Sequence, residues 1–219
     1  MAVSFSNNSA YDAGSYTNNH TLAAFNCSAA NSHLVVGVAN RVFTADVAGA
    51  TANAVAMTLR TGATSENTNV AGVGVFDHTI SNASFNVVVN TPSYRLAAVM
   101  AVALSGVDQS TPTIGTPVTA GGFSSTATAS YTGTADNMLL IFGNTQGAAT
   151  LTASGCTQGL NADHPDGSLG QYFAGYVVAT GSAQTIGFTL GGNDNWQISI
   201  VEIKAATGAV INSGFFMFM

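Results

Sequence analysis

The chain has 219 residues, of which 47% are hydrophobic and only 6% are charged, and its formal net charge is −6. So high a hydrophobic fraction with so modest a net charge excludes an intrinsically disordered chain. Only four Lys and Arg residues are present, so no basic patch can form, and we expect no nucleic-acid partner. The polar surface must come from Ser, Thr, Asn and Gly, the residues of turns and solvent-facing strand positions.

The first residues, MAVSFSNNSAYDAGSY, lack the positively charged and apolar regions of a secretory signal peptide. No run reaches the roughly 18 apolar residues of a membrane span, so we expect no membrane partner. The protein is expected to be made in the cytoplasm and, if it acts outside, to leave by a route such as lysis. Cys27 and Cys156 are too few for a disulfide scaffold, which leaves two buried free thiols or a single bridge.

Short apolar runs separated by Gly, Asn, Ser and Thr turns predict strands along the chain. In the first part they cover residues 3–5, 21–25, 33–42, 54–59, 70–76 and 84–90. The longest run without an obligate breaker follows, YRLAAVMAVALSGVDQSTP (residues 94–112). In it Met100, Val102 and Leu104 alternate with smaller apolar residues at positions 99, 101 and 103. With turn residues at both ends, this pattern favours a central strand that is covered on both faces. Periodicity alone does not distinguish such a strand from a buried helix.

Residues 111–130 are rich in Thr, Gly and Ser, and their isolated apolar residues predict a meandering edge rather than a linker. Further strands are expected at residues 138–142, 150–157, 170–180, 184–190 and 196–204. Strands that recur every ~8–15 residues predict an all-β fold, a single antiparallel β-sandwich that is jelly-roll-like. We place this domain at residues 15–206, with residues 1–14 as an N-terminal arm or edge strand.

Residues 207–219 are predicted to form a hydrophobic C-terminal arm. The segment has no charged side chain and ends in Phe215, Phe216, Met217, Phe218 and Met219. A solvated terminus has no physical reason to carry five bulky apolar residues, because an exposed apolar patch promotes association. The segment could be a last strand of the chain's own sandwich or an arm that contacts a neighbouring subunit. We favour the intersubunit contact, because residues 196–204 already supply the predicted closing strand.

Four segments together resemble a known domain: LAAVMAVALSGVDQSTP, with HLVVGVANRV and NASFNVVVN before it and NWQISIVEIKAA near the end. They are similar to a β-sandwich domain that recurs in bacteriophage virion proteins and in large bacterial surface proteins. The resemblance covers about residues 21–206, and its motifs are structural. It implies a structural or adhesive role. A stand-alone chain without a signal peptide fits a virion component better than a secreted adhesin.

Residue types that carry catalysis are scattered through the sequence. The histidines fall in different loops and strand ends, at His20, His33, His78 and His164. Neither cysteine has a neighbouring base, and no G-x-S-x-G motif is present. Glu202 lies on the apolar closing strand, where we expect a structural ion pair with Lys204 or Arg41. The sequence therefore predicts a protein that is not an enzyme, with no catalytic residue and no cofactor.

The most site-like stretch is the loop NADHPDGS at residues 161–168. Its Asp163 and Asp166, together with Asp194, offer carboxylate oxygens of the kind that Ca²⁺ binds. Pro-Asp-Gly is also a ready-made β-turn, and the spacing matches no known metal loop. Turn formation explains these aspartates better, so they are weak metal candidates and no metal is predicted.

Three aromatic residues define a second binding hypothesis. Tyr172 and Tyr176 share one face of a predicted strand, and with Trp196 they could form a stacking platform for a sugar. Core or subunit packing explains the same residues equally well. The alternative function is therefore a glycan-binding adhesin or receptor-binding module that acts through surface loops and recognises a host-surface glycan.

The main expectation is a non-enzymatic structural protein of a bacteriophage virion. It would be a capsid decoration (cement) protein or a tail or fibre component, located in the particle. It would assemble with itself as a homo-oligomer, such as a trimer, and contact other virion proteins. The sandwich surfaces and the C-terminal arm would supply the apolar area that drives this assembly.

Overall fold

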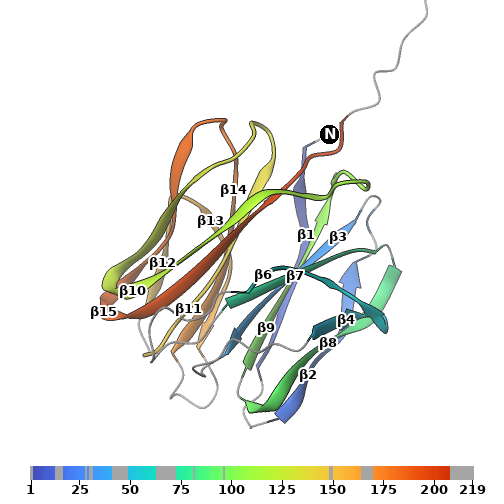
Figure 1. The fold of residues 1–219 in the computed structure, drawn as a ribbon, viewed down its shortest axis with the longest axis horizontal. Coiled ribbons are helices and arrows are strands. Elements are labelled where there is room, and N and C mark those ends of the chain that lie inside the picture. The colour runs from blue at the N-terminus through green and yellow to red at the C-terminus, as the bar shows by residue number, and fades with distance from the viewer. Residues whose placement is uncertain are drawn as a thin grey trace, which may run out of the picture.

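The computed structural model describes residues 2–12, 17–27, 29, 32–40, 49–62, 73–80, 82–95, 97–147, 150–163 and 170–207. Within these ranges every regular element is a strand, every strand pairing is antiparallel, and no helix occurs that could cross a membrane. The predicted all-β, antiparallel, sandwich-like fold is therefore confirmed. The strands form three sheets (Figure 1). Two apolar clusters lie between the sheets, and a third lies within one of them. The predicted C-terminal arm, residues 207–219, lies outside the described residues except for Thr207.

The central sheet has the strand order β1-β9-β3-β7-β6. Its members are β1 (Ser4–Asp12), β9 (Ala97–Ser105), β3 (His33–Asn40), β7 (Val73–Thr79) and β6 (Thr58–Gly62). The N-terminal segment contributes β1, which pairs with β9 at the edge of this sheet. All of residues 97–104 are buried, because β9 is flanked by strands on both sides and covered on both faces.

The four-stranded sheet packs against one face of the central sheet. Its order is β2-β8-β4-β5, with β2 (Thr17–Cys27), β8 (Asn82–Arg95), β4 (Gly49–Ala52) and β5 (Val55–Ala56). Val99, Ala101 and Ala103 of β9 belong to the apolar cluster between these two sheets. Met100, Val102 and Leu104 belong to the cluster on the opposite face. The predicted central strand with one small and one large apolar face is thus confirmed.

The curled sheet contains the remaining strands, in the order β10-β15-β11-β14-β13, with β12 paired to β15. These are β10 (Thr113–Thr132), β11 (Met138–Thr145), β12 (Leu151–Ser154), β13 (Thr157–Asp163), β14 (Gln171–Val178) and β15 (Ala183–Ile203). It fills one half of the molecule in Figure 1, opposite β1 to β9. Met138, Leu140 and Phe142 of β11 face the central sheet and share the apolar cluster with Met100.

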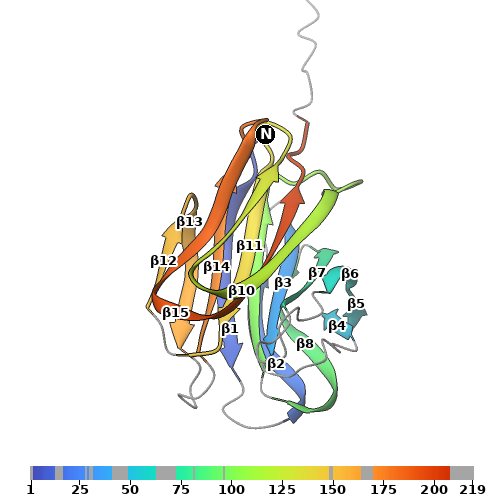
Figure 2. The same ribbon diagram turned by 60° about the vertical axis from the view of Figure 1, so that its left-hand side comes forward.

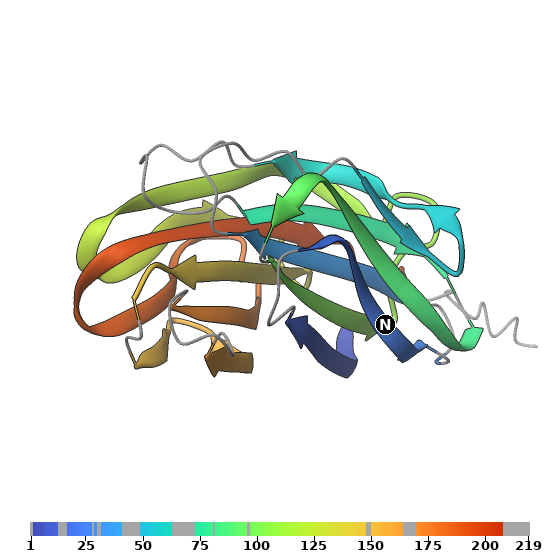
Figure 3. The same ribbon diagram turned by 90° about the horizontal axis from the view of Figure 1, so that it is seen from below.

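The curl comes from a bend in the two longest strands. β10 has 20 residues and β15 has 21, and they pair along most of their length, with register shifts at two places. Between Ser124 and Thr126 the partner on β15 jumps from Asp194 to Thr189, which inserts extra residues on one side. The strands then fold back over a third cluster, which contains Ile141, Phe173, Phe188 and Trp196 (Figures 2 and 3). Residues 111–130, expected to be a meandering edge, thus supply nearly all of one bent edge strand, β10.

Candidate functional site

Tyr172 and Tyr176, two of the aromatics proposed to bind a sugar, lie on β14 and point into the molecule. Tyr172 is only 7% exposed and belongs to the apolar cluster between the central and curled sheets. Tyr176 packs against the same cluster, and its ring stacks on Phe5 of β1 with a centroid distance of 4.7 Å and an interplanar angle of 21°. Both rings therefore connect the two sheets.

Trp196 lies in a different cluster, so the three aromatics do not form one platform. Its side chain is 8% exposed and packs with Phe173 and Phe188 inside the curled sheet. The indole Nε1 donates a hydrogen bond to Ser124 Oγ at 2.9 Å, beside the bend in β10. The indole ring also lies beside Gly122, where a Cβ would stand 3.4 Å from its Cζ2 atom. Trp196 therefore supports the curl rather than an exposed stacking surface.

The aspartates proposed as weak metal candidates are engaged elsewhere or lie outside the described residues, as Asp166 does. The carboxylate of Asp194 accepts backbone N–H groups from Gly147 and from Asn195, each at 2.7 Å. Asp163 accepts a hydrogen bond from the side-chain amide of Gln171. In the ranges that the structure describes, no three His, Cys, Asp or Glu residues are grouped to hold a metal ion.

Asp77 is the centre of a buried polar cluster that the sequence did not indicate. It is 2% exposed and lies on β7, on the same face as buried Val75. Arg60 Nε donates to its Oδ1 at 2.7 Å, and Thr113 at the start of β10 donates its hydroxyl to Oδ2. His33 Nε2, from β3, lies 3.1 Å from the same Oδ2. One carboxylate thus connects three strands of the central sheet to the curled sheet.

The pKa of Asp77 is held below its ordinary value. Burial, the largest single influence, raises it, but the hydrogen bonds from His33, Arg60 and Thr113 together lower it further than burial raises it. An ionised carboxylate only accepts hydrogen bonds, so His33 Nε2 donates to Asp77. His33 Nδ1 forms a second hydrogen bond with Thr79 Oγ1, at 3.2 Å.

Thr79, His33 and Asp77 follow the hydroxyl, imidazole and carboxylate order of a catalytic triad. Two features favour a structural role instead. The His33 side chain is 1% exposed, and both carboxylate oxygens of Asp77 are already engaged by Arg60 and Thr113. The imidazole is therefore fixed between neighbouring strands, where it completes the hydrogen bonding of a buried charge.

Glu202 was expected to pair with Lys204 or Arg41, and its partners are different. The carboxylate is 4% exposed, and its Oε1 accepts the Thr134 backbone N–H at 2.8 Å and the Asn137 side-chain amide at 2.7 Å. Its Oε2 accepts the Tyr131 hydroxyl at 3.3 Å. Lys204 instead pairs with Asp108 at 3.0 Å, and Arg41 lies outside the described residues. Burial, together with the charge of Glu202, raises the pKa of Tyr131 to about 12.

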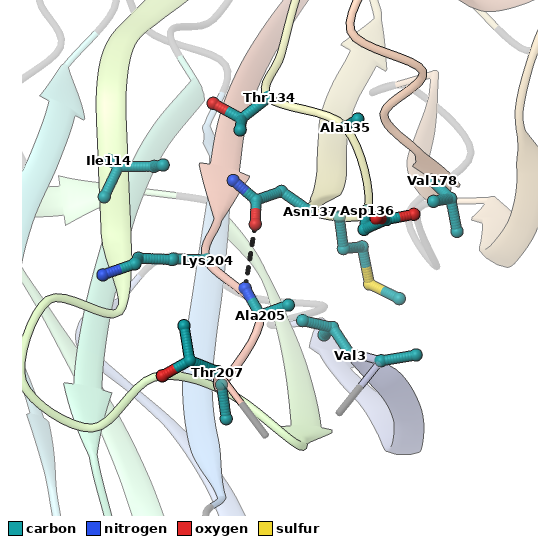
Figure 4. A pocket seen from close by; sticks show the side chains of 13 residues that line it. Val3, Ile114, Thr134, Ala135, Asp136, Asn137, Val178, Lys204, Ala205 and Thr207 are labelled. Atoms are coloured by element: carbon teal, nitrogen blue, oxygen red, sulfur yellow. Dashed lines mark hydrogen bonds between the residues drawn. The ribbon is translucent and has the colours of Figure 1, made fainter. Parts of the chain in front are cut away.

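A hollow of about 530 Å³ opens beside Asn137, at the end of the molecule where the described chain finishes. Val3, Ile114 and Val178 line it together with the last described residue, Thr207 (Figure 4). Asn137 Oδ1 accepts the Ala205 backbone N–H at 3.0 Å and fixes the chain as it leaves β15. The predicted arm thus begins from the rim of a partly apolar hollow.

Four large apolar side chains of the described residues are strongly exposed. They are Phe123 (64%), Val178 (52%), Leu59 (51%) and Val55 (48%). Both cysteines are free thiols, and burial raises the pKa of each, so the possible disulfide between them is absent. Phe215 to Met219, the residues predicted to form the assembly interface, lie outside the described residues.

Comparison with known proteins adds no relative. No family model, no curated protein and no solved structure matches this chain. Its function must therefore be inferred from its own residues. These contain two buried polar clusters that are internally satisfied, few charged residues, and four strongly exposed apolar side chains among the described residues.

Proposed function

We propose that this chain is a non-enzymatic structural protein of a bacteriophage virion, either a capsid decoration or a tail or fibre component. It assembles with copies of itself and contacts other virion proteins. The supporting observation is the location of its polar and apolar side chains. Asp77 and Glu202 are buried and hydrogen-bonded within the chain, whereas apolar side chains such as Phe123 are exposed. Such a surface suits association better than catalysis. The placement in a virion rests on the sequence resemblance.

The C-terminal arm supplies most of the driving force in this proposal. The described chain ends at Thr207, which lines the same hollow as exposed Val178, and the twelve residues that follow in the sequence carry no charged side chain. Full burial of a Phe or Met side chain contributes about 1.5–3 kcal/mol, so five of them offer roughly 8–15 kcal/mol before ordering costs. That gross gain is enough for an arm to hold a neighbouring subunit.

The test is the molar mass of the purified protein by light scattering, with the full chain beside a chain that stops at Ser213. We expect the full chain to form an oligomer that dissociates on truncation, because the apolar contact area is lost. A chain with residues 215–219 replaced by serine is the matched control for length, and it should dissociate as well. A monomer in every form, or an oligomer unchanged by both variants, would contradict the proposed role of the arm.

A further inference from the structure

The second half of β10, residues 126–132, is an open sheet edge whose pairing with β15 has a regular register. Within the part of the chain that the structure describes, β10 has a strand partner on one side only, β15. Residues 126–132 keep seven consecutive pairs with β15, from Thr126 opposite Thr189 to Thr132 opposite Ala183, without a register shift. Their sequence, TATASYT, contains no charge, no proline and no glycine. Such an edge presents its free backbone groups as a template for another strand.

The other long edges carry features that discourage pairing. The first half of β10 contains Pro117 and a register shift, and β13 has a shift and ends in Asp163. β6 has a shift beside Arg60, and shifts also interrupt β1 and β2. The remaining edge strands, β5 and β12, have only two and four residues. Residues 118–124 of β10 also keep seven consecutive pairs with β15, but they contain Gly121 and Gly122, which weaken a strand. Among the described strands, residues 126–132 therefore form the longest uninterrupted edge that is free of proline, glycine and charge.

The side chains of this edge suit contact with an identical edge. Ala127 and Tyr131 point into the third apolar cluster, whereas Thr126, Ser130 and Thr132 are exposed. The adjoining outward positions are also uncharged: Thr185 and Thr189 on β15, and Thr152 and Ser154 on β12. When two copies of a chain with net charge −6 meet here, no like charges are brought together. The edge is thus self-compatible in charge.

We propose that residues 126–132 pair antiparallel with the same residues of a second copy of this chain, across a two-fold axis at Ala129. This register uses the whole stretch and places Thr128 opposite Ser130 of the second copy. The outer strands of the two curled sheets then form one six-stranded sheet. A seven-residue edge is small beside the ~1,200–2,000 Å² of a stable interface, so it strengthens assembly through avidity with the arm. The inference therefore rests on the proposed self-assembly.

The experiment places charges on the edge. In T128K/S130K, four lysines gather at the two-fold axis, and in T128E/S130E four glutamates do so. Each variant alone should dissociate at a concentration at least about tenfold higher than the wild-type chain, because like charges would meet. An equimolar mixture of the two should restore association, since opposite charges then face each other. The control T152K/S154K adds the same charge on β12, on the same sheet face, and should associate like wild type.

Sedimentation velocity over a concentration series measures association, and native mass spectrometry identifies the mixed Lys–Glu species. Recovery in the mixture also shows that both variants are folded. Wild-type association by T128K/S130K, or failure of the mixture to recover, would overturn the edge pairing. The chain stopped at Ser213, run beside them, separates the two proposals. If truncation dissociates the oligomer and the edge charges do not, the arm contact stands and the edge inference falls.

Discussion

At the scale of single residues, the two buried carboxylates are held in different ways. Asp77 is surrounded by a guanidinium, an imidazole and a hydroxyl from separate strands, and Arg60 compensates its charge directly. Glu202 receives only neutral donors, which come from β10, Asn137 and the turn before β11. Removal of either carboxylate would leave several buried donors unpaired, which costs more than the pairing contributes. The Asp77 cluster therefore specifies how the central and curled sheets meet, whereas the Glu202 cluster joins neighbouring strands of the curled sheet.

We expect Asp77→Asn to lower the free energy of unfolding at neutral pH by about 2–4 kcal/mol, because Arg60 loses its buried partner. The pH dependence should change as well. Since the pKa of Asp77 is lower in the folded chain than the ~3.9 of an unfolded Asp, its stabilisation is complete above the unfolded value. It is lost as the pH falls through the folded value. We expect the free energy of unfolding, measured with urea from about pH 6 down to about pH 2, to fall less steeply in the variant than in the wild-type chain. This acid part of the curve is the acid limb.

Asp136→Asn makes the same chemical change at an exposed turn and is the matched control. It should leave both the neutral-pH stability and the acid limb close to those of the wild-type chain. An acid limb in Asp77→Asn as steep as in the wild type would show that this carboxylate is not the group that titrates.

At the scale of elements, the contact between the central and curled sheets depends on one close approach. Gly37 of β3 faces Phe142 of β11, and a Cβ at position 37 would lie 2.2 Å from the ring atom Cδ1. Phe142 is fully buried in the same cluster as Val35 and Val75 of the neighbouring strands. The missing side chain at Gly37 therefore makes room for the largest residue of β11, and the two sheets interlock there.

Gly37→Ala should destabilise the chain by about 1–3 kcal/mol, because the added methyl group overlaps the Phe142 ring. Gly49→Ala on β4 is the control: nothing lies within 4 Å of a Cβ there, so the change should stay below about 1 kcal/mol. The double variant Gly37→Ala with Phe142→Leu should be more stable than the sum of the two single changes predicts. Equal effects at positions 37 and 49 in thermal unfolding would contradict this interlocking.

At the scale of the whole molecule, the small number of charges determines how copies can meet. Two of the described acidic side chains, Asp77 and Glu202, are buried, and the pair of Lys204 with Asp108 lies beside the hollow. Few charges therefore remain on the surface to guide or oppose association. Apolar side chains and backbone edges must supply both the affinity and the geometry of assembly.

The proposed oligomer should accordingly depend weakly on salt. Between about 0.05 M and about 0.5 M NaCl, we expect the dissociation constant of the wild-type chain to change by less than about threefold. The mixed T128K/S130K and T128E/S130E species should weaken much more over the same range, because its added contacts are ionic. Analytical ultracentrifugation at both salt concentrations measures the two dependences. Strong weakening of the wild-type oligomer would mean that charge pairs hold it together.

The local pattern of the sequence predicted a large part of the fold. Alternation along residues 97–104 identified a strand with two apolar faces, and the even spacing of Tyr172 and Tyr176 placed both on one face. These features depend on period-two geometry, which is a property of each strand alone. The turn residues indicated some strand starts, such as His33 and Met138, but many strands are longer than expected. Residues 184–190 and 196–204, expected as two strands, form the single bent strand β15.

The sequence by itself therefore determined that this is an antiparallel β protein with few charges and a buried central strand. Only the tertiary structure decided which side chains meet. Glu202 bonds to Tyr131 and Asn137, which lie 71 and 65 positions away in the chain. The donors around Asp77 come from three further strands. The physical reason is that strand pairing and sheet stacking bring together residues that are far apart in the chain and separated by no fixed number of positions. Such contacts leave no periodic signal that a single sequence could reveal.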